Sequence, residues 1–222
     1  CSTGIAFGLI GLLLAYYAAQ GVAVDPTLNW KDLLAIGSAL PPQLMQLAFI
    51  FIFIGYGTKA GLVPMHSWLP DAHSAAPAPI SALLSGILLP VALTAVLRFK
   101  LIVDASLGDS TWTGSFLIIF GVISVLVAAA FILIQHDYKR LLAYSSIEHM
   151  GIISILFGVS GVAAVAGVIH LVAHALIKSG LFYGAASIVE RFKSTRFSNV
   201  TGVARVLPHT ALLFLIGMFA LL

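Results

Sequence analysis

Three basic side chains recur every four residues in the stretch VIHLVAHALIKSG, where His170 is followed by His174 and Lys178. On a helix, each step of four residues turns about 40° beyond a full revolution and rises about 6 Å, so the three side chains share one face. Imidazole titrates near neutral pH, and removal from water disfavours the charged form of an amine. A column of such groups can therefore pass protons from one member to the next.

Two other interpretations of this column stay open. The side chains can be polar groups that are satisfied within a core, or the two histidines can bind Zn²⁺, which accepts imidazole ligands four residues apart on a helix. No carboxylate or thiolate falls on the same face of the segment, and the HExxH pattern is absent. We therefore favour proton transfer and expect no metal site.

A second pair of candidate groups, Glu148 and His149, lies in the stretch KRLLAYSSIEHMGIISILFG. An ionisable side chain inside a membrane helix costs several kcal/mol, roughly 2.5–3.5 for a charge at the helix centre, and is a functional hypothesis by default. Glu148 is expected within about two turns of the membrane surface. Two interpretations are balanced here: a carboxylate that lines a cavity, and a solvated helix end.

A third candidate, Lys59, stands where an apolar run is interrupted. The run continues as GYGTKAGLVPMHSWLPDAHSAAPAP, with three glycines before Pro64. Proline removes a backbone donor and clashes with the preceding turn, so we predict a helix that is broken near residues 57–64 and resumes to about Ala76. Irregular backbone at membrane depth lines a cavity or is buried in protein. The alternative is a helix that ends near Gly61, with the lysine snorkelling to the interface.

The other polar residues of these stretches are expected to have structural roles. Around WLPDAH, we expect His66, Asp71 and His73 to position the second half of the broken helix through local hydrogen bonds to the backbone. Arg98 and Lys100 follow the third apolar run and are interpreted as charges that orient the chain in the membrane.

The composition places all of these residues in a membrane. Of 222 residues, 60% are hydrophobic and only 9% are charged, and the mean hydropathy is +1.09. Soluble chains carry about 25% charged residues. Seven runs approach the roughly 20 apolar residues that cross a bilayer. They lie at residues 4–20, 44–62, 79–98, 114–134, 141–159, 162–189 and from 208 onward. Backbone amides in lipid must pair within their own segment, so we predict an all-α, polytopic transmembrane helix bundle.

The basic residues between the runs predict an orientation. Connections 135–140 and 190–207 carry six lysines and arginines, whereas the alternate connections carry three. The positive-inside tendency then places 135–140 and 190–207 in the cytoplasm, in a multi-pass protein of the inner, cytoplasmic membrane. The basic residues form no stripe that could bind nucleic acid. The single cysteine, Cys1, rules out a cysteine-ligated metal cluster, so we expect no redox cofactor.

Three long motifs resemble the antiporter-like membrane subunits shared by respiratory complex I, the Mrp Na⁺/H⁺ antiporters and the group 4 hydrogenases. They are GTKAGLVPMHSWLPDAHSAAPAPISALLSGILL, DYKRLLAYSSIEHMGI and HLVAHALIKSGLFYGAASI. Within this superfamily, the forms SSIEHMG and WLPDAHSAAPAPISALLSG most resemble the hydrogenase-4 and formate hydrogenlyase branch. The similarity covers essentially the whole chain.

The resemblance implies roles for individual residues. It makes Lys59 the proton-carrying lysine of a first half-channel, and it places His170, His174 and Lys178 on a hydrophilic axis that runs laterally through the membrane arm. One departure is Pro90, which stands where several complex I subunits have a lysine. That departure puts a direct proton transfer between the second and third apolar runs in doubt.

The resemblance also implies the organisation of the chain. Such subunits have about fourteen helices in two inverted repeats. We expect this sequence to be a fragment of one antiporter-like transmembrane domain, with the end of the first repeat at about residues 1–98 and part of the second at about 114–222. Expected partners are other membrane-arm subunits of a hydrogenase or complex I-like assembly, the lipid bilayer, and protons or Na⁺.

The expected function is proton movement in a redox-driven complex, by a subunit without a catalytic centre of its own. Three alternatives follow from the same sequence. One is Na⁺/H⁺ exchange on the same scaffold, and a second is a structural subunit that conducts nothing. The third, a retinal-type receptor, is suggested by the segment count and the buried lysines, but a suitable mid-helix carboxylate counter-ion is missing.

Overall fold

The computed structural model describes residues 2–221, and over that range the chain is helical with no strand. Cys1, on which the argument against a cysteine-ligated cluster depends, lies outside the described residues, as does Leu222. The α-helices are α1 (Ser2–Gln20), α2 (Trp30–Ala35), α3 (Pro42–Ala60), α4 (Trp68–Ala75), α5 (Ala78–Leu83), α6 (Leu89–Leu107), α7 (Thr111–Leu133), α8 (Tyr138–Val159), α9 (Gly161–Phe192), α10 (Val203–Val206) and α11 (Pro208–Phe219).

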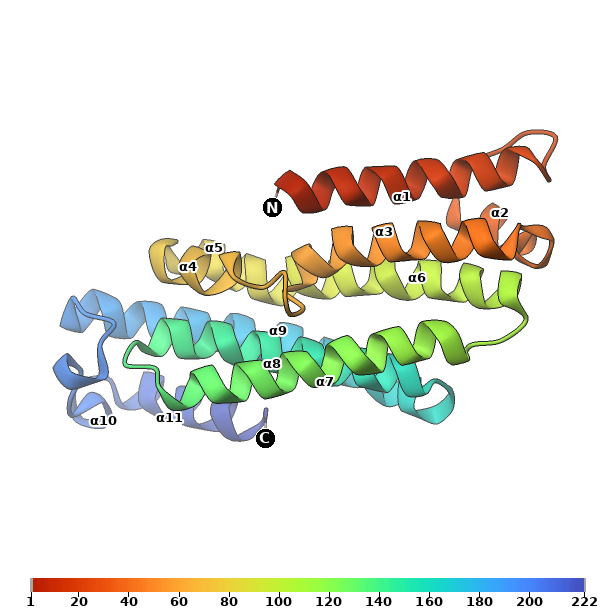
Figure 1. Ribbon diagram of the computed structural model, residues 1–222. Coiled ribbons are helices and arrows are strands. Elements are labelled where there is room, and N and C mark those ends of the chain that lie inside the picture. Colours follow the sequence, from red (N-terminus) through yellow and green to blue (C-terminus); the bar gives the residue numbers. More distant parts are fainter. Residues whose placement is uncertain (1, 222) are drawn as a thin grey trace.

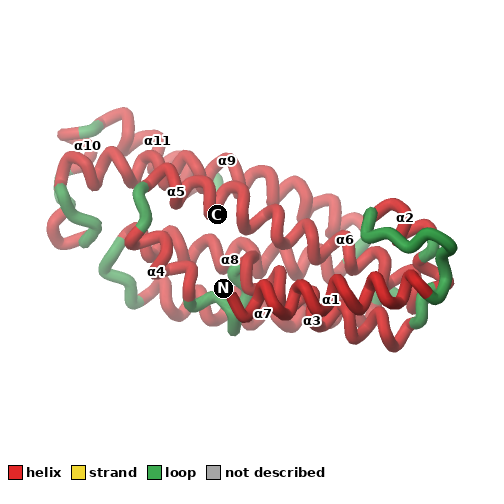
Figure 2. The backbone as a smooth tube through the Cα atoms, turned by 90° about the horizontal axis from the view of Figure 1, so that it is seen from above, coloured by secondary structure: helices red, strands yellow, loops and turns green. Residues whose placement is uncertain are grey.

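The long helices run side by side along one direction (Figure 1), and most of the loops lie at the two ends of the bundle (Figure 2). We call these the α2 end, with connections 21–29 and 108–110, and the α10 end, with connections 134–137 and 193–202. Helix α1 packs on α3, α7 on α8, α8 on α9, and α11 on α9. The all-α bundle predicted from composition is confirmed.

Five stretches are long and apolar enough to cross a bilayer, judged by length and composition. They are Ser2–Gln20, Ala78–Leu107, Thr111–Leu133, Tyr138–Val159 and Gly161–Phe192. The two remaining predicted segments correspond to α3, with 19 residues, and α11, with 12 residues. The stretch Ala78–Leu107, which corresponds to the third predicted segment, extends nine residues beyond the predicted end at 98. It also contains a π-helical turn at Leu84–Leu88, between α5 and α6.

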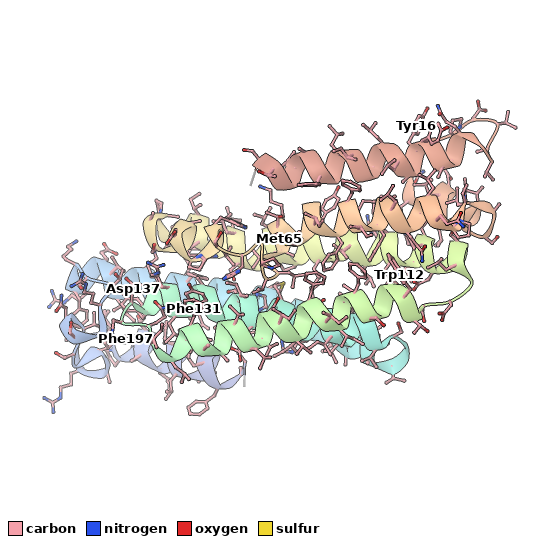
Figure 3. The ribbon with its side chains drawn as sticks, in the orientation of Figure 1. Tyr16, Met65, Trp112, Phe131, Asp137 and Phe197 are labelled. Carbon is pink, nitrogen blue, oxygen red and sulfur yellow. The ribbon has the colours of Figure 1, made fainter. Side chains whose placement is uncertain are left out.

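The predicted break in the second segment is present. Helix α3 ends at Ala60, and the next residue, Gly61, adopts the left-handed conformation (φ 78°) that favours glycine. The chain then turns through a cis Val63–Pro64 bond and resumes as α4 at Trp68, four residues later than predicted. Met65 marks the turn about halfway along the bundle (Figure 3).

Side chains satisfy the backbone groups that the break releases. The backbone N–H of Val63 donates to Ser124 Oγ on α7 at 2.9 Å. The indole Nε1–H of Trp68 donates to the carbonyl oxygen of Thr58 at 2.7 Å. Because irregular backbone in a membrane must find such partners within the protein, these bonds stabilise an interruption at this depth.

Helices α7 and α8 approach each other at two pairs of glycines. A Cβ added to Gly114 would lie 2.6 Å from the carbonyl oxygen of Gly158, and one added to Gly121 would lie 2.7 Å from that of Gly151. Small residues allow such close packing of membrane helices, where the gain comes from van der Waals contact. Ser154 adds a hydrogen bond of 2.9 Å from its Oγ to the carbonyl oxygen of Leu117. These contacts hold one side of α8 against α7, and another side of α8 packs against α9.

Candidate functional site

The three basic residues of α9 occupy one side of a single continuous helix, Gly161–Phe192. His174 and Lys178 are completely buried, and His170 is half-buried. The two histidines lie against His149 of α8, and Lys178 donates a hydrogen bond to Ser145 of the same helix. The spacing of four residues therefore brings them together as the sequence predicts.

Helix α8 contributes the facing groups. His149 Nδ1 lies 2.9 Å from His170 Nε2, a hydrogen bond whose direction depends on the tautomers. The rings of His149 and His174 lie 5.4 Å apart between centroids. We define the histidine–lysine cluster by the residues of the two helices that meet here: Ser145, Glu148, His149, His170, His174 and Lys178.

Lys178 has neutral hydrogen-bond partners. Its Nζ donates to Ser145 Oγ at 2.7 Å and to the carbonyl oxygen of Leu142 at 3.4 Å. Among residues 2–221 it makes no salt bridge within 4.0 Å. Glu148 is half-buried and lies one turn after Ser145 on α8. An ammonium group in an apolar bundle is costly, and here a hydroxyl and a carbonyl compensate part of that cost.

His174 adds buried polar atoms without partners. Neither of its ring nitrogens has a hydrogen-bond partner among the described residues. Buried polar atoms in proteins are nearly always bonded to protein or to ordered water. The cluster therefore combines an amine, three imidazoles and a carboxylate, a set of groups that can accept and release protons in sequence.

Lys59 lies apart from the cluster. It is half-buried near the end of α3, and its Nζ is 5.9 Å from the centroid of the Trp68 ring, a cation–π contact across the break. It also lines a hollow of about 290 Å³ between α1 and α3, beside Gly4, Gly8 and Gly55. Within residues 2–221, the hydrogen bonds between side chains do not connect Lys59 to Lys178. The structure thus contains two separate sites.

Two lysines that sequence analysis interpreted as orientation charges are buried. Lys139, 6% exposed, donates from Nζ to the carbonyl oxygens of Ala76 (2.7 Å) and Ser74 (3.4 Å) at the end of α4. Lys100, 2% exposed, forms an ion pair with Asp104 within α6. Both lysines lie within helices, Lys100 in α6 and Lys139 in the first turn of α8.

The role expected for the WLPDAH side chains also needs correction. His73 is completely buried, but neither of its ring nitrogens is hydrogen-bonded within the described residues. Its ring stacks on Phe182 of α9, with 4.6 Å between centroids and 12° between planes. Asp71 instead forms an exposed ion pair with Arg140 at 3.0 Å. Helix α4 is therefore held by contacts with α8 and α9, since its partners lie on those helices.

A hollow of about 940 Å³ lies elsewhere, between α9, α10 and α11. Its lining is almost entirely apolar and includes Phe197, Leu212 and Phe214. The lining also includes Tyr138, which carries a phenol. Among residues 2–221, no set of three or more His, Cys, Asp and Glu side chains is placed to hold a metal ion. The chemistry of this chain is therefore concentrated in the histidine–lysine cluster and at Lys59.

Helix α3 is broken, and a buried amine and imidazoles lie on the adjacent helices α8 and α9, an arrangement that occurs in polytopic membrane proteins that move ions. The chain belongs to the NADH:quinone oxidoreductase/Mrp antiporter transmembrane family, whose model matches residues 4–222. Its relatives include components of hydrogenase-4 and a subunit of NADH-quinone oxidoreductase.

Individual relatives agree with this assignment. The chain is 42% identical over 221 residues to the hydrogenase-4 component F homolog of Methylacidiphilum infernorum (isolate V4), covering 98% of this chain and 46% of that protein. It is 34% identical over 182 residues to formate hydrogenlyase subunit 3 of Escherichia coli (strain K12), covering 76% of this chain and 29% of that protein. The chain thus spans half or less of the length of these curated relatives.

Solved structures show the same fold. A chain of the membrane-bound sulfane sulfur reductase, an archaeal respiratory membrane complex, superposes with a TM-score of 0.86 at 29% identity, covering 96% of this chain and 43% of that chain. A chain of the Mrp complex from Dietzia sp. DQ12-45-1b superposes with a TM-score of 0.83 at 23% identity, covering 98% and 40%.

Proposed function

We propose that this chain is part of a proton-translocating membrane subunit of a redox-driven complex, of the hydrogenase or NADH:quinone oxidoreductase type. Protons move through Lys59 and through the histidine–lysine cluster. The observation that carries the proposal is Lys178, which is fully buried with neutral hydrogen-bond partners and shares one side of α9 with His170 and His174. A lysine in this setting gains and loses a proton without leaving a partner carboxylate unpaired.

The chemistry of the cluster supports transfer in steps. His149 and His170 are already hydrogen-bonded at 2.9 Å, so a proton on one ring can pass to the other along an existing bond. The unpartnered nitrogens of His174 accept water that connects these rings with Lys178. Glu148 lies one turn after Ser145, the hydroxyl partner of Lys178, so a change in that carboxylate's charge alters the lysine's hold on its proton.

Lys59 is the proposed second carrier. Its cation–π contact with Trp68 joins the two sides of the break, and a movement of α4 relative to α3 would change the environment of the ammonium group. Because the hydrogen bonds described above leave Lys59 and Lys178 unconnected, transfer between them requires water.

The assembly and orientation belong to the same proposal. The partners are other membrane-arm subunits, since the relatives include a component of hydrogenase-4 and a subunit of formate hydrogenlyase. The chain is a piece of one antiporter-like domain with two repeats, at about residues 1–98 and 114–222. Connections 135–140 and 190–207 face the cytoplasm, because they carry most of the basic residues between segments. The subunit itself holds no redox cofactor and leaves electron transfer to its partners.

The test uses the full-length protein in its complex, reconstituted into sealed vesicles with a membrane potential imposed by a potassium gradient and valinomycin. An entrapped pH dye measures proton entry, and ²²Na⁺ measures sodium entry. We expect proton entry that Lys59→Met abolishes, together with electron transfer that is slowed or uncoupled. Proton entry that is unchanged in Lys59→Met and in Lys178→Met would reject the proposal.

Na⁺/H⁺ exchange is retained as a second candidate because of the similarity in fold to the Mrp complex. In the same vesicles, sodium entry that requires Lys59 and is coupled to proton exit would favour exchange. Proton entry that is independent of sodium would favour proton pumping.

A further inference from the structure

His73 is a buried imidazole that the proposed function does not use. It lies on α4, its exposed fraction is 0%, and neither Nδ1 nor Nε2 has a hydrogen-bond partner within residues 2–221. Leaving a buried polar atom without a partner costs about 1–3 kcal/mol. Proteins avoid this cost by placing ordered water at such atoms. The two ring nitrogens therefore mark positions for buried water.

The ring lies close to the histidine–lysine cluster. It stacks on Phe182, which is one helical turn beyond Lys178 on the same side of α9. The charges of Lys178 and Lys139 are both near enough to act on the His73 ring. Ser81 donates to the carbonyl oxygen of His73 at 3.2 Å, which fixes the backbone and leaves the ring nitrogens free.

Lys139 lies on the other side of His73, toward the α10 end. It binds the carbonyl oxygens of Ser74 and Ala76, one and three residues after His73. Along α8, Lys139 precedes Ser145 by six residues, about 9 Å of helix. It is the second residue of α8, directly after the connection 134–137. Titratable groups thus follow one another from Lys178 through His73 to Lys139 and the end of the bundle.

We propose that His73, with water at both ring nitrogens, extends the histidine–lysine cluster to the aqueous phase at the α10 end, where Lys139 lies. The inference rests on the proposed function and adds to it a route by which Lys178 exchanges protons with one side of the membrane. A proton from water on the Lys139 side binds one ring nitrogen, and the proton on the other nitrogen passes through water to the neutral amine of Lys178. The ring then carries the opposite tautomer, and a flip in its own plane against Phe182 restores the first.

The alternative for His73 is a packing role, because its ring stacks on Phe182. The two roles predict opposite orders for two substitutions. His73→Phe keeps an aromatic ring of similar shape and removes both nitrogens, whereas His73→Gln keeps polar atoms that bind water and loses the stacking. A packing role makes Phe the better replacement. A water-filled proton route makes Gln the better one.

The experiment measures proton entry into vesicles that contain the full-length protein in its complex, with equal amounts of assembled complex in each sample. We expect His73→Phe to lower the initial rate by about ten-fold or more, a conservative figure for removing a proton-transfer group. His73→Gln should retain a higher rate than His73→Phe. His136→Phe, which changes an exposed histidine at the same end of the bundle, serves as the matched control and should leave the rate unchanged.

A rate for His73→Phe that equals or exceeds that of His73→Gln overturns the inference. A second measurement does not depend on the variants folding: a high-resolution structure of the wild-type complex should show water within about 3 Å of each ring nitrogen of His73. Dry, tightly packed nitrogens would also overturn it. If Lys178→Met stops proton entry and His73→Phe does not, the proposed function stands and the route through His73 is rejected. If neither has an effect, both are rejected.

Discussion

Lys100 and Lys178 are both buried lysines of membrane-spanning stretches, with exposed fractions of 2% and 0%, but their partners differ. Lys100 forms an ion pair with Asp104, one turn later on the same helix. That carboxylate also accepts a hydrogen bond from Thr113 on α7. Lys178 has a hydroxyl and a backbone carbonyl as partners, both from the neighbouring helix α8.

Burial and function are therefore separate properties of these two lysines. Lys100 is the counter-charge of the Asp104 carboxylate, so its removal would leave that carboxylate unpaired. If Lys178 lost its proton, its two neutral partners would still be satisfied by water or by the amine. A buried lysine therefore indicates a proton carrier only when no carboxylate is fixed beside it. Four predictions test whether the partner of a charge decides its role.

The largest effect is expected at Lys178. Lys178→Met should abolish proton entry while the thermal stability of the complex stays equal or increases, because an apolar side chain replaces a buried charge without leaving another charge unpaired. Proton entry into vesicles and the melting temperature of the purified complex measure the two effects. A variant that still moves protons, or one that loses stability together with activity, would contradict the difference in role between Lys178 and Lys100.

The opposite result is expected at Lys100. Lys100→Met leaves the half-buried Asp104 carboxylate without a counter-charge and should cost up to about 3–5 kcal/mol in stability, the loss for a fully buried pair. Proton entry per assembled complex should be unchanged. The double variant Lys100→Met, Asp104→Leu serves as the control, and it should recover most of the stability because both charges are removed. Failure of this recovery would show that the lysine contributes more than its ion pair.

A smaller effect is expected at Lys139, which donates to backbone carbonyls at the end of α4. Lys139→Met should reduce stability by about 1.5–3 kcal/mol, the range for a hydrogen bond that involves a charged group. Lys139→Arg keeps a charged donor and should lose less. Denaturation of the complex in detergent, followed by tryptophan fluorescence, measures the loss. Equal stability of the Met and Arg variants would mean that Lys139 does not hold α4.

The smallest effect is expected at the exposed pair of Asp71 and Arg140, whose side chains are 73% and 40% exposed. Exposed ion pairs contribute about 0–1 kcal/mol. Asp71→Asn and Arg140→Gln should therefore change stability by less than about 1 kcal/mol, and they should change it less in high salt, which screens the pair. A larger loss in either variant would indicate that this pair, and not Lys139, fixes α4.

Much of the fold could be predicted from the sequence. The apolar runs locate the long helices because lipid offers the backbone no partners, and Pro64 locates the break because proline cannot continue α3. The end of α6 could not be predicted. Arg98 and Lys100 suggested an early end, but the ion pair of Lys100 with Asp104 allows the helix to continue to Leu107.

The candidate site could be predicted in part. The spacing of His170, His174 and Lys178 on one helix shows that they share a face. The contact between His170 and His149 could not be predicted, because it depends on how α8 and α9 are aligned. For the same reason, His73 could not be placed against α9.

The sequence by itself determined an all-helical membrane protein, the position of its break and the column of basic side chains on α9, because these follow from the local chain and from lipid as the solvent. Only the tertiary structure decided which buried charges have fixed partners. Lys100 is paired within its helix, Lys139 caps α4, and Lys178 meets a neutral hydroxyl on α8. The physical reason is that a charge in an apolar bundle depends on groups within a few ångströms, and those groups come from segments far apart in the chain.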